Sequence, residues 1–312
     1  KSLLATALDV GGDAADRRIV EQAVQGKCIE SRKQRRLPEA GVTSEWAELA
    51  MLRANWDATS PRLLVNYCEG IATELCVGRS EFWSGQCAPK VTVNGRLLSP
   101  RAGWEEICWH CDEDVDYLEL ELPLEDDWKL QRQFVLARGD QFLFIADAVC
   151  GPIEHDIEYQ CMWPVVEKVE VTTADETTEV GLRYKKRALK FLPLGLSEWR
   201  QEARRVGELR PTGDGLEYRL RRRGRRLYAP LFVDLHAARA KKEPTWRTLT
   251  VGEGRQACPP EVAVAYRVQA GPHQWLIYRS LAAVASRTVL GQNTFQEFSC
   301  GRFECDGEFE AL

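Results

Sequence analysis

One stretch constrains the fold of this chain more than any other: residues 128–149, which read WKLQRQFVLARGDQFLFIADAV. Two runs of strand-forming residues flank Gly139-Asp140, and glycine first in a two-residue loop is typical of a type II′ hairpin turn. That turn fixes the register. On one face of the sheet it pairs Leu136 with Leu143, Phe134 with Ile145, Arg132 with Asp147, and Leu130 with Val149. The sequence therefore predicts an arginine–aspartate pair within an otherwise apolar sheet face.

Arg132 and Asp147 have two interpretations. A structural cross-strand pair that fixes the register is favoured. The functional alternative is a contact with a carboxylate or a sugar hydroxyl in a concave sheet face. The chain also contains ten tryptophans, a residue that fills sandwich cores or stacks on sugar rings. The core is the default for most of them, and Trp104 and Trp109 join Arg132 and Asp147 as the candidate ligand-binding residues.

Strand signals continue along the rest of the chain, separated by turn signals and by no long helical pattern. Leu118, Leu120, Leu122 and Leu124 alternate onto one face, and Gly271-Pro272 predicts a hairpin pairing Val268 with Trp275 and Tyr266 with Ile277. Strands are expected over 62–68, 71–78, 90–93, 104–109, 115–123, 128–138, 141–150, 157–164, 168–173, 178–184, 188–192, 215–221, 225–235, 246–251, 262–270, 273–281 and 295–303. This succession predicts an all-β fold, a large antiparallel, supersandwich-like β-sandwich.

The first forty residues differ from the rest. Residues 13–27 read as a polar helix ending near Gly26, and a charged segment and LPEAG follow. We therefore expect a helical and linker segment over 1–41 and the β-sandwich domain over 42–312. The chain has no initiator Met, so we expect a fragment or a processed product.

Composition excludes several classes of function. A net charge of -5 argues against nucleic-acid binding, and the basic runs 32–36, 200–205 and 219–226 are interpreted as solvated faces or protected edges. No stretch approaches the roughly 20 apolar residues of a membrane span. Eleven irregularly spaced cysteines favour free thiols and a reducing, cytoplasmic compartment over a disulfide framework.

No motif indicates a metal, a cofactor or a catalytic set. Cys108, His110 and Cys111 lie beside acidic residues, but no second ligand pair with zinc spacing exists, so an acidic turn is favoured. Glycine-rich phosphate loops and nucleophile-elbow motifs are missing. The four histidines are scattered and none sits in a catalytic pattern: His110, His155, His236 and His273. We expect no metal and no cofactor.

Two segments carry a resemblance to a known family. Residues 37–41 (LPEAG) and 50–57 (AMLRANWD) resemble the opening of the β-domain of heparinase II/III-type polysaccharide lyases, where a P-x-x-G segment precedes hydrophobic-Arg-x-x-Trp. The stretch from Gln131 to Val149 is similar to the "R … G-D-x-hydrophobic … D-x-V" hairpin of the same sandwich. The resemblance covers about residues 37–151 and extends to uncharacterised heparinase-like bacterial proteins.

That resemblance implies a supersandwich following an α/α-toroid, acidic glycans as partners, and a periplasmic or secreted location. The family's chemistry removes a proton beside a uronate carboxylate, using Tyr and His. Here the helical domain is missing apart from the short N-terminal segment, and residues 75–93 contain no histidine where the family's motif is expected. No catalytic residue is therefore transferred to this chain.

Three functions remain open. The leading hypothesis is a carbohydrate-related β-sandwich protein that is accessory or non-catalytic as it stands and binds an acidic polysaccharide or oligosaccharide. The first alternative is a polysaccharide lyase acting by β-elimination, which would need a missing helical domain. The second is a protein-interaction scaffold with no glycan role. A concave sheet face carrying Trp, Arg and carboxylates would favour the carbohydrate hypotheses.

Overall fold

Strands make up nearly all the regular structure of the described residues, which confirms the predicted all-β class. The computed structural model describes residues 38–203, 205–304 and 308–312, so the predicted helical and linker segment over 1–41 lies almost entirely outside them. Residues 40–312 form one unit. Its helical elements are short: Glu125–Asp127, Arg200–Ala203 (α3) and Arg239–Lys241. Among the described residues no helix is long and apolar enough to cross a membrane.

Four antiparallel sheets contain these strands. The N-terminal sheet has the order β1 (Val42–Ser44), β2 (Leu49–Arg53), β3 (Pro61–Asn66), β4 (Ala72–Val77), β5 (Ser80–Gln86). The large sheet has the order β12 (Glu170–Thr173), β13 (Val180–Tyr184), β14 (Arg187–Pro193), β16 (Gly215–Asp234), β11 (Phe142–Trp163), β10 (Lys129–Ala137), β9 (Val115–Pro123), β8 (Glu105–Cys111). Three more strands belong to this sheet: β15 (Gly207–Thr212) pairs with β16, β6 (Lys90–Val93) pairs with β11, and β7 (Arg96–Leu97) pairs with β6.

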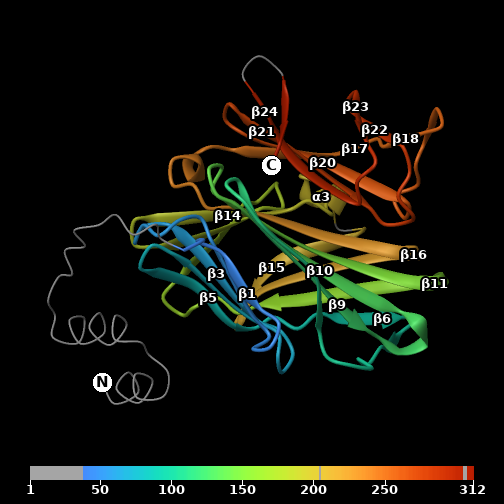
Figure 1. Ribbon diagram of the computed structural model, residues 1–312, viewed down its shortest axis with the longest axis horizontal. Helices are drawn as coiled ribbons and strands as arrows, with labels where there is room; N and C mark the ends of the chain where they lie inside the picture. Colours follow the sequence, from blue (N-terminus) through green and yellow to red (C-terminus); the bar gives the residue numbers. More distant parts are fainter. Residues whose placement is uncertain (1–37, 204, 305–307) are drawn as a thin grey trace, which may run out of the picture. The chain divides into compact units, whose positions relative to one another are not determined.

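Two further sheets follow in the C-terminal part. The third sheet has the order β17 (Pro244–Leu249), β20 (Ala263–Ala270), β21 (His273–Ser280), β24 (Phe298–Phe303), β25 (Phe309–Ala311). The small sheet has the order β19 (Gln256–Ala257), β18 (Gly252–Glu253), β22 (Arg287–Val289), β23 (Gln292–Thr294). In Figure 1 the third sheet, orange to red, lies above the large sheet, and the blue N-terminal sheet lies at the left, alongside it.

The predicted hairpin forms with the predicted register. Arg132 pairs with Asp147 across β10 and β11, and the other three expected pairs are also present. The turn is not the type II′ turn that we predicted. Residues 138–141 form a four-residue loop in which the amide of Gln141 donates to the carbonyl of Ala137 at 2.9 Å, and Gln141 takes the left-handed conformation at φ 51°. Four loop residues keep the same pairs opposite each other as two would.

β11 and β16 are single long strands where the sequence predicts two strands each. A bulge between Cys150 and His155 interrupts the ladder that joins them. The hydroxyl of Tyr159 nevertheless donates to the carboxylate of Asp147 on the same strand. Twelve residues of straight strand would span about 40 Å, so the strand folds back at the bulge. Its two halves therefore form opposite walls of one core.

The alternating side chains of these strands fill two cores. Phe134 and Leu136 point into the main core, which the N-terminal sheet and the later half of β11 close from the other side. Val135 and Ala137, one residue out of phase, point into a second core beneath Trp275 of the third sheet. The predicted leucine face of β9 lies in the main core, and the predicted hairpin between β20 and β21 has the expected pairs. The middle of the large sheet is thus buried on both faces.

Candidate functional site

Arg132 and Asp147 meet inside the main core. The guanidinium donates to the carboxylate twice, from Nε at 2.7 Å and from Nη2 at 2.5 Å. Arg132 also donates to the carbonyl of Cys87 at 2.8 Å. Their side chains are 0% and 1% exposed, so neither reaches a ligand at the surface in this conformation. The pair links the two walls of the sandwich, because Tyr159 joins it from the opposite half of β11.

Electrostatics keeps the Arg132 guanidinium charged. Burial alone would lower the pKa of Arg132, but the adjacent Asp147 carboxylate holds that pKa well above its ordinary value. Burial and the same carboxylate raise the pKa of Tyr159 well above its ordinary value. Tyr159 therefore stays protonated and acts as a hydrogen-bond donor to Asp147.

The two candidate tryptophans lie at different depths. Trp104 is 5% exposed and packs in the main core, with its ring centroid 5.8 Å from the guanidinium carbon of Arg132. Trp109 is half-buried and packs against the same core from β8. The structure thus places Trp104 beside the Arg132–Asp147 pair. Trp104, Arg132 and Asp147 are all buried.

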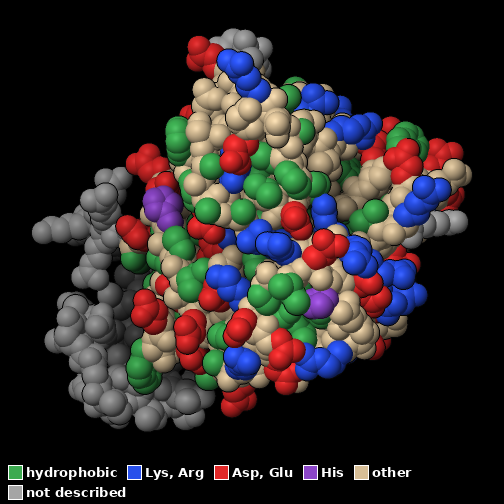
Figure 2. All heavy atoms as spheres, turned by 90° about the vertical axis from the view of Figure 1, so that its right-hand side faces the viewer, with side chains coloured by type: hydrophobic (Ala, Val, Ile, Leu, Met, Phe, Trp, Pro, Cys, Tyr) green, Lys and Arg blue, Asp and Glu red, His purple; other side chains and the backbone are tan. Residues whose placement is uncertain are grey.

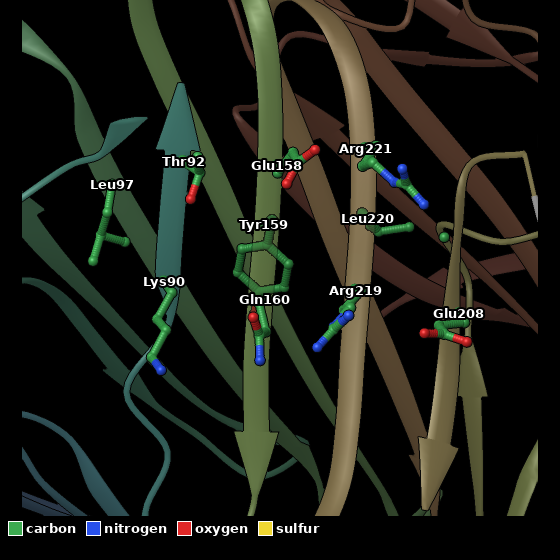
Figure 3. A pocket seen from close by; sticks show the side chains of 11 residues that line it. Lys90, Thr92, Leu97, Glu158, Tyr159, Gln160, Glu208, Arg219, Leu220 and Arg221 are labelled. Atoms are coloured by element: carbon green, nitrogen blue, oxygen red, sulfur yellow. The ribbon is translucent and has the colours of Figure 1, made fainter. Parts of the chain in front are cut away.

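A polar hollow lies on the outer face of the sandwich wall formed by the later half of β11 and the first half of β16. Its volume is about 510 Å³. Lysine, arginine, carboxylate and amide side chains reach it from four neighbouring strands (Figure 3). We call these residues the outer polar strip: Lys90, Thr92, Glu158, Gln160, Glu208, Arg219 and Arg221.

Strand alternation explains why these polar residues share one face. Ile157, Tyr159 and Cys161 point into the main core, so Glu158 and Gln160 between them point outward. β6 and β15 extend the row on either side of β11 and β16.

Pairing places these side chains in two rows. Lys90 lies opposite Gln160, Gln160 opposite Arg219, and Arg219 opposite Glu208. The second row contains Thr92, Glu158 and Arg221. Because neighbouring strands lie about 4.8 Å apart, each row offers a line of polar groups across the sheet.

One buried carboxylate organises the end of this strip. Glu217 accepts hydrogen bonds from Arg219 and from Arg210, each at 2.8 Å, and from Gln160 at 2.5 Å. Burial would raise the pKa of Glu217, but the hydrogen bonds from Arg210 and Arg219 outweigh it and lower that pKa. Arg219 is therefore partly neutralised and held in place.

The remaining cations of the strip have no such partner. Neither Lys90 nor Arg221 forms a side-chain hydrogen bond or ion pair with any residue in the described ranges, and both are exposed. The strip therefore presents two unpaired positive charges and one partly neutralised guanidinium.

The hollow offers charge and hydrogen bonds but no acid–base pair. No histidine lines it among the described residues, and its one tyrosine, Tyr159, points its hydroxyl into the core toward Asp147. Elsewhere Nε2 of His110 donates to the carboxylate of Asp112 at 2.8 Å on the exposed β8 edge. The described residues contain no group of three or more His, Cys, Asp or Glu side chains positioned to hold a metal ion.

The sequence alone indicates only some residues of the outer polar strip. The basic run 219–226 predicts a solvated face or a protected edge. Arg219 and Arg221 do lie on a face, near Glu217, but β16 is not an edge strand here because β11 and β15 flank it. The sequence does not single out Lys90, Gln160 or Glu208, because a local sequence pattern does not determine which strands pair with each other.

The fold defines a class: this chain has the β-sandwich of the heparinase-type lyases. The heparan sulfate lyase HepC from Pedobacter heparinus superposes with a TM-score of 0.62 at 11% identity, over 90% of this chain and 48% of that one. A heparinase III gives 0.57 at 12%, covering 84% and 45%, and another gives 0.54 at 10%, covering 79% and 43%. This chain thus spans about half the length of these proteins. No protein-family profile and no curated protein sequence matches it.

Proposed function

We propose that this chain is an accessory, non-catalytic carbohydrate-binding β-sandwich that holds an acidic glycan on its outer polar strip. The observation that carries the proposal is the unpaired state of Lys90 and Arg221 beside Arg219 in an open hollow of about 510 Å³. Carboxylate and sulfate groups of an acidic glycan are natural acceptors for such cations. Gln160 and Thr92 supply further hydrogen-bonding groups for sugar hydroxyls.

The similarity of fold supports a glycan partner. The solved structures that share this sandwich include a heparan sulfate lyase. The carboxylates of the strip, Glu158 and Glu208, distinguish it from a purely basic surface and favour hydroxyl-rich ligands over a bare polyanion. Figure 2 shows that acidic and basic side chains intermingle over one face of the molecule, without a continuous field of one sign.

The non-catalytic part of the proposal rests on acid–base chemistry. β-Elimination needs a base beside the proton and an acid beside the leaving oxygen, each within hydrogen-bond reach. The strip has carboxylates and cations, but its tyrosine hydroxyl is committed to Asp147. A lyase that used this strip would therefore need a Tyr or His from outside the strip.

The test is binding to immobilised heparan sulfate, a second acidic glycan and a neutral glycan at low and moderate salt. The test variant changes Lys90 and Arg221 to alanine. Its charge-matched control changes two exposed cations elsewhere, Arg183 and Lys186.

We expect the test variant to bind an acidic glycan about tenfold more weakly, because each exposed charge contact contributes about 0.2–1 kcal/mol. The control variant should bind like the parent chain. Equal binding by both variants would refute the strip as the site. Absence of binding to every glycan would favour the protein-scaffold alternative.

Catalysis is measured in the same samples. β-Elimination leaves an unsaturated uronate whose ultraviolet absorbance rises with turnover. We expect no rise with this chain alone. A rise with this chain alone would refute the accessory role and establish the lyase alternative.

A further inference from the structure

The strand β8 is a free edge of the large sheet. It pairs with β9 and with no other strand of the described residues. Four of its seven residues are exposed, and Ile107 among them is 46% exposed. An edge strand presents unpaired amides and carbonyls, so it can pair with a strand of another chain. Neither the fold comparison nor the proposed glycan site assigns this edge a role.

Hydrogen bonding at the turn between β8 and β9 shows which backbone groups lie on the free side. The amide of Asp112 donates to the carbonyl of Val115 at 3.0 Å. Because hydrogen-bonded and non-bonded pairs alternate along an antiparallel ladder, His110 and Cys108 also direct their amides and carbonyls toward β9. Trp109 and Cys111 lie one residue out of phase, so their amides and carbonyls point to the free side. Each of these two residues therefore offers one donor and one acceptor to an added strand.

Contacts on the inner face of β8 hold this edge in place. Thr43 of the N-terminal sheet donates to the carboxylate of Glu106 at 2.5 Å, and Tyr67 donates to the same carboxylate at 3.0 Å. Arg138 donates to the sulfur of Cys111 at 3.1 Å. A partner that pairs with β8 would therefore meet a strand that is already ordered, which lowers the entropic cost of binding.

An open hollow of about 510 Å³, which we call the edge hollow, lies beside this strand. Ile107, Cys108 and His110 line it from β8, and Phe298 lines it from β24. Phe298 is half-buried and stacks on Tyr117 with ring centroids 5.4 Å apart. When a peptide adds to a sheet edge, backbone pairing gives affinity and pockets for alternate side chains give specificity. The edge hollow provides such a place for apolar side chains.

The sequence around this edge is acidic. Residues 105–116 contain six Asp or Glu residues and no Lys or Arg. Four of these acidic residues are exposed: Glu105, Asp112, Glu113 and Asp114. Antiparallel pairing of two copies of β8 about Trp109 would place Glu106 opposite Asp112, and like charges directly opposite each other destabilise a strand pair. Charge complementarity therefore favours a basic partner strand over a second copy of this chain.

We propose that the free edge of β8 binds an extended basic and apolar segment of a partner protein. The segment adds to the large sheet as a strand and places apolar side chains in the edge hollow. The proposal goes beyond the glycan function, because the partner is a protein segment recognised by backbone pairing. The outer polar strip contributes no residue to it.

The probe is a fluorescein-labelled peptide of four Lys-Val repeats, whose binding is followed by fluorescence anisotropy. Lys and Val alternate onto opposite faces of an extended strand. A Glu-Val peptide of the same length is the charge control. We expect saturable binding of the Lys-Val peptide and about tenfold or more weaker binding of the Glu-Val peptide, because the acidic residues near the edge repel it.

Two backbone-methylated peptides test for strand pairing itself. One carries an N-methyl group on every Lys amide and the other on every Val amide, so each loses one alternate set of donors and keeps its side chains and charges. An added strand turns only one of these sets toward β8. We therefore expect one methylated peptide to bind about tenfold or more weakly than the unmethylated peptide, and the other to bind within about threefold of it.

A matched pair of variants locates the binding. Ile107→Lys places a cation beside the edge hollow at a position that is 46% exposed, and Ile153→Lys makes the same change at a site 56% exposed on β11, outside the hollow. Both variants change the net charge equally. Only Ile107→Lys should weaken binding of the Lys-Val peptide, by about tenfold. Circular dichroism establishes that each variant is folded, and the methylated peptides provide the second test if Ile107→Lys does not fold.

Four binding results would each overturn the proposal. They are no saturable binding of the Lys-Val peptide, equally tight binding of the Glu-Val peptide, equal effects of the two methylations, and equal peptide binding by the Ile107→Lys and Ile153→Lys variants. Sedimentation of the chain without peptide provides a fifth. A dimer of the parent chain that Ile107→Lys abolishes would make this edge a contact between two copies and overturn the basic partner.

Discussion

Replacing Asp147 with alanine should destabilise this protein more than most single substitutions would. The change leaves the guanidinium of Arg132 in the main core without its carboxylate and leaves the Tyr159 hydroxyl without its acceptor. Breaking a buried ion pair by removing one partner costs about 3–5 kcal/mol. Each kcal/mol shifts the melting temperature of a domain of this size by about 2–4 °C. We therefore expect the melting temperature to fall by about 6–20 °C.

Glu121→Ala is the control for this substitution. Glu121 is also a strand carboxylate next to β10, and it accepts from Lys129 at 2.8 Å and from Gln131 at 2.9 Å. Its side chain is 27% exposed, against 1% for Asp147. Water replaces its lost contacts, so the expected cost is about 0.2–1 kcal/mol. Thermal unfolding followed by circular dichroism compares the two variants.

A double variant separates the charge effect from loss of packing. Arg132→Met with Asp147→Leu removes both charges and keeps most of the side-chain volume. Replacing a buried pair in this way is often neutral or stabilising, so we expect the double variant to melt above Asp147→Ala. Equal, small losses in Asp147→Ala and Glu121→Ala would refute the reasoning.

Three further predictions follow from burial, pH and backbone contact. Glu217→Gln should be less stable than the parent above the ordinary glutamate pKa of 4.5. Because the folded-state pKa is lowered, that difference should shrink as the pH falls below 4.5, and pH-dependent melting measures it. Trp275→Ala should cost about 3–5 kcal/mol in denaturant unfolding, since Trp275 is fully buried, whereas Trp46→Ala, at a residue 95% exposed, should cost about 0.5 kcal/mol or less. Gly207→Ala should cost about 1–3 kcal/mol in the same measurement, because its Cβ would lie 2.0 Å from the carbonyl oxygen of Arg219.

Local pattern explains what the sequence could predict about this fold. The pairing of Arg132 with Asp147 followed from a short loop between two alternating runs, which is information held within 22 residues. The leucine face of β9 and the hairpin between β20 and β21 followed from the same period of two. The turn type was wrong because two and four loop residues leave the same pairs opposite each other.

Long-range pairing explains what the sequence could not predict. The fold-back of β11 at the bulge after Cys150 depends on contacts such as that between Tyr159 and Asp147. The outer polar strip joins Lys90 to Arg219 through Gln160, across strands far apart in the chain. Neither arrangement has a local signature. Trp104 illustrates the same limit, since its residue type fits a sugar platform and a core equally well, and only the fold shows that it is buried.

The two faces of this sandwich wall differ in their role, since inward residues pack in the core and outward residues are exposed. This difference makes the proposed glycan site testable. Stability resides in the inward residues of β11 and β16, where Tyr159 and Cys161 pack in the main core. Lys90 and Arg221 lie on the outward face, and their side chains form no hydrogen bond or ion pair with the described residues. Exposed substitutions away from such contacts change stability by about 0.5 kcal/mol or less. A loss of glycan binding after changing these outward residues would therefore report on lost ligand contacts and not on unfolding.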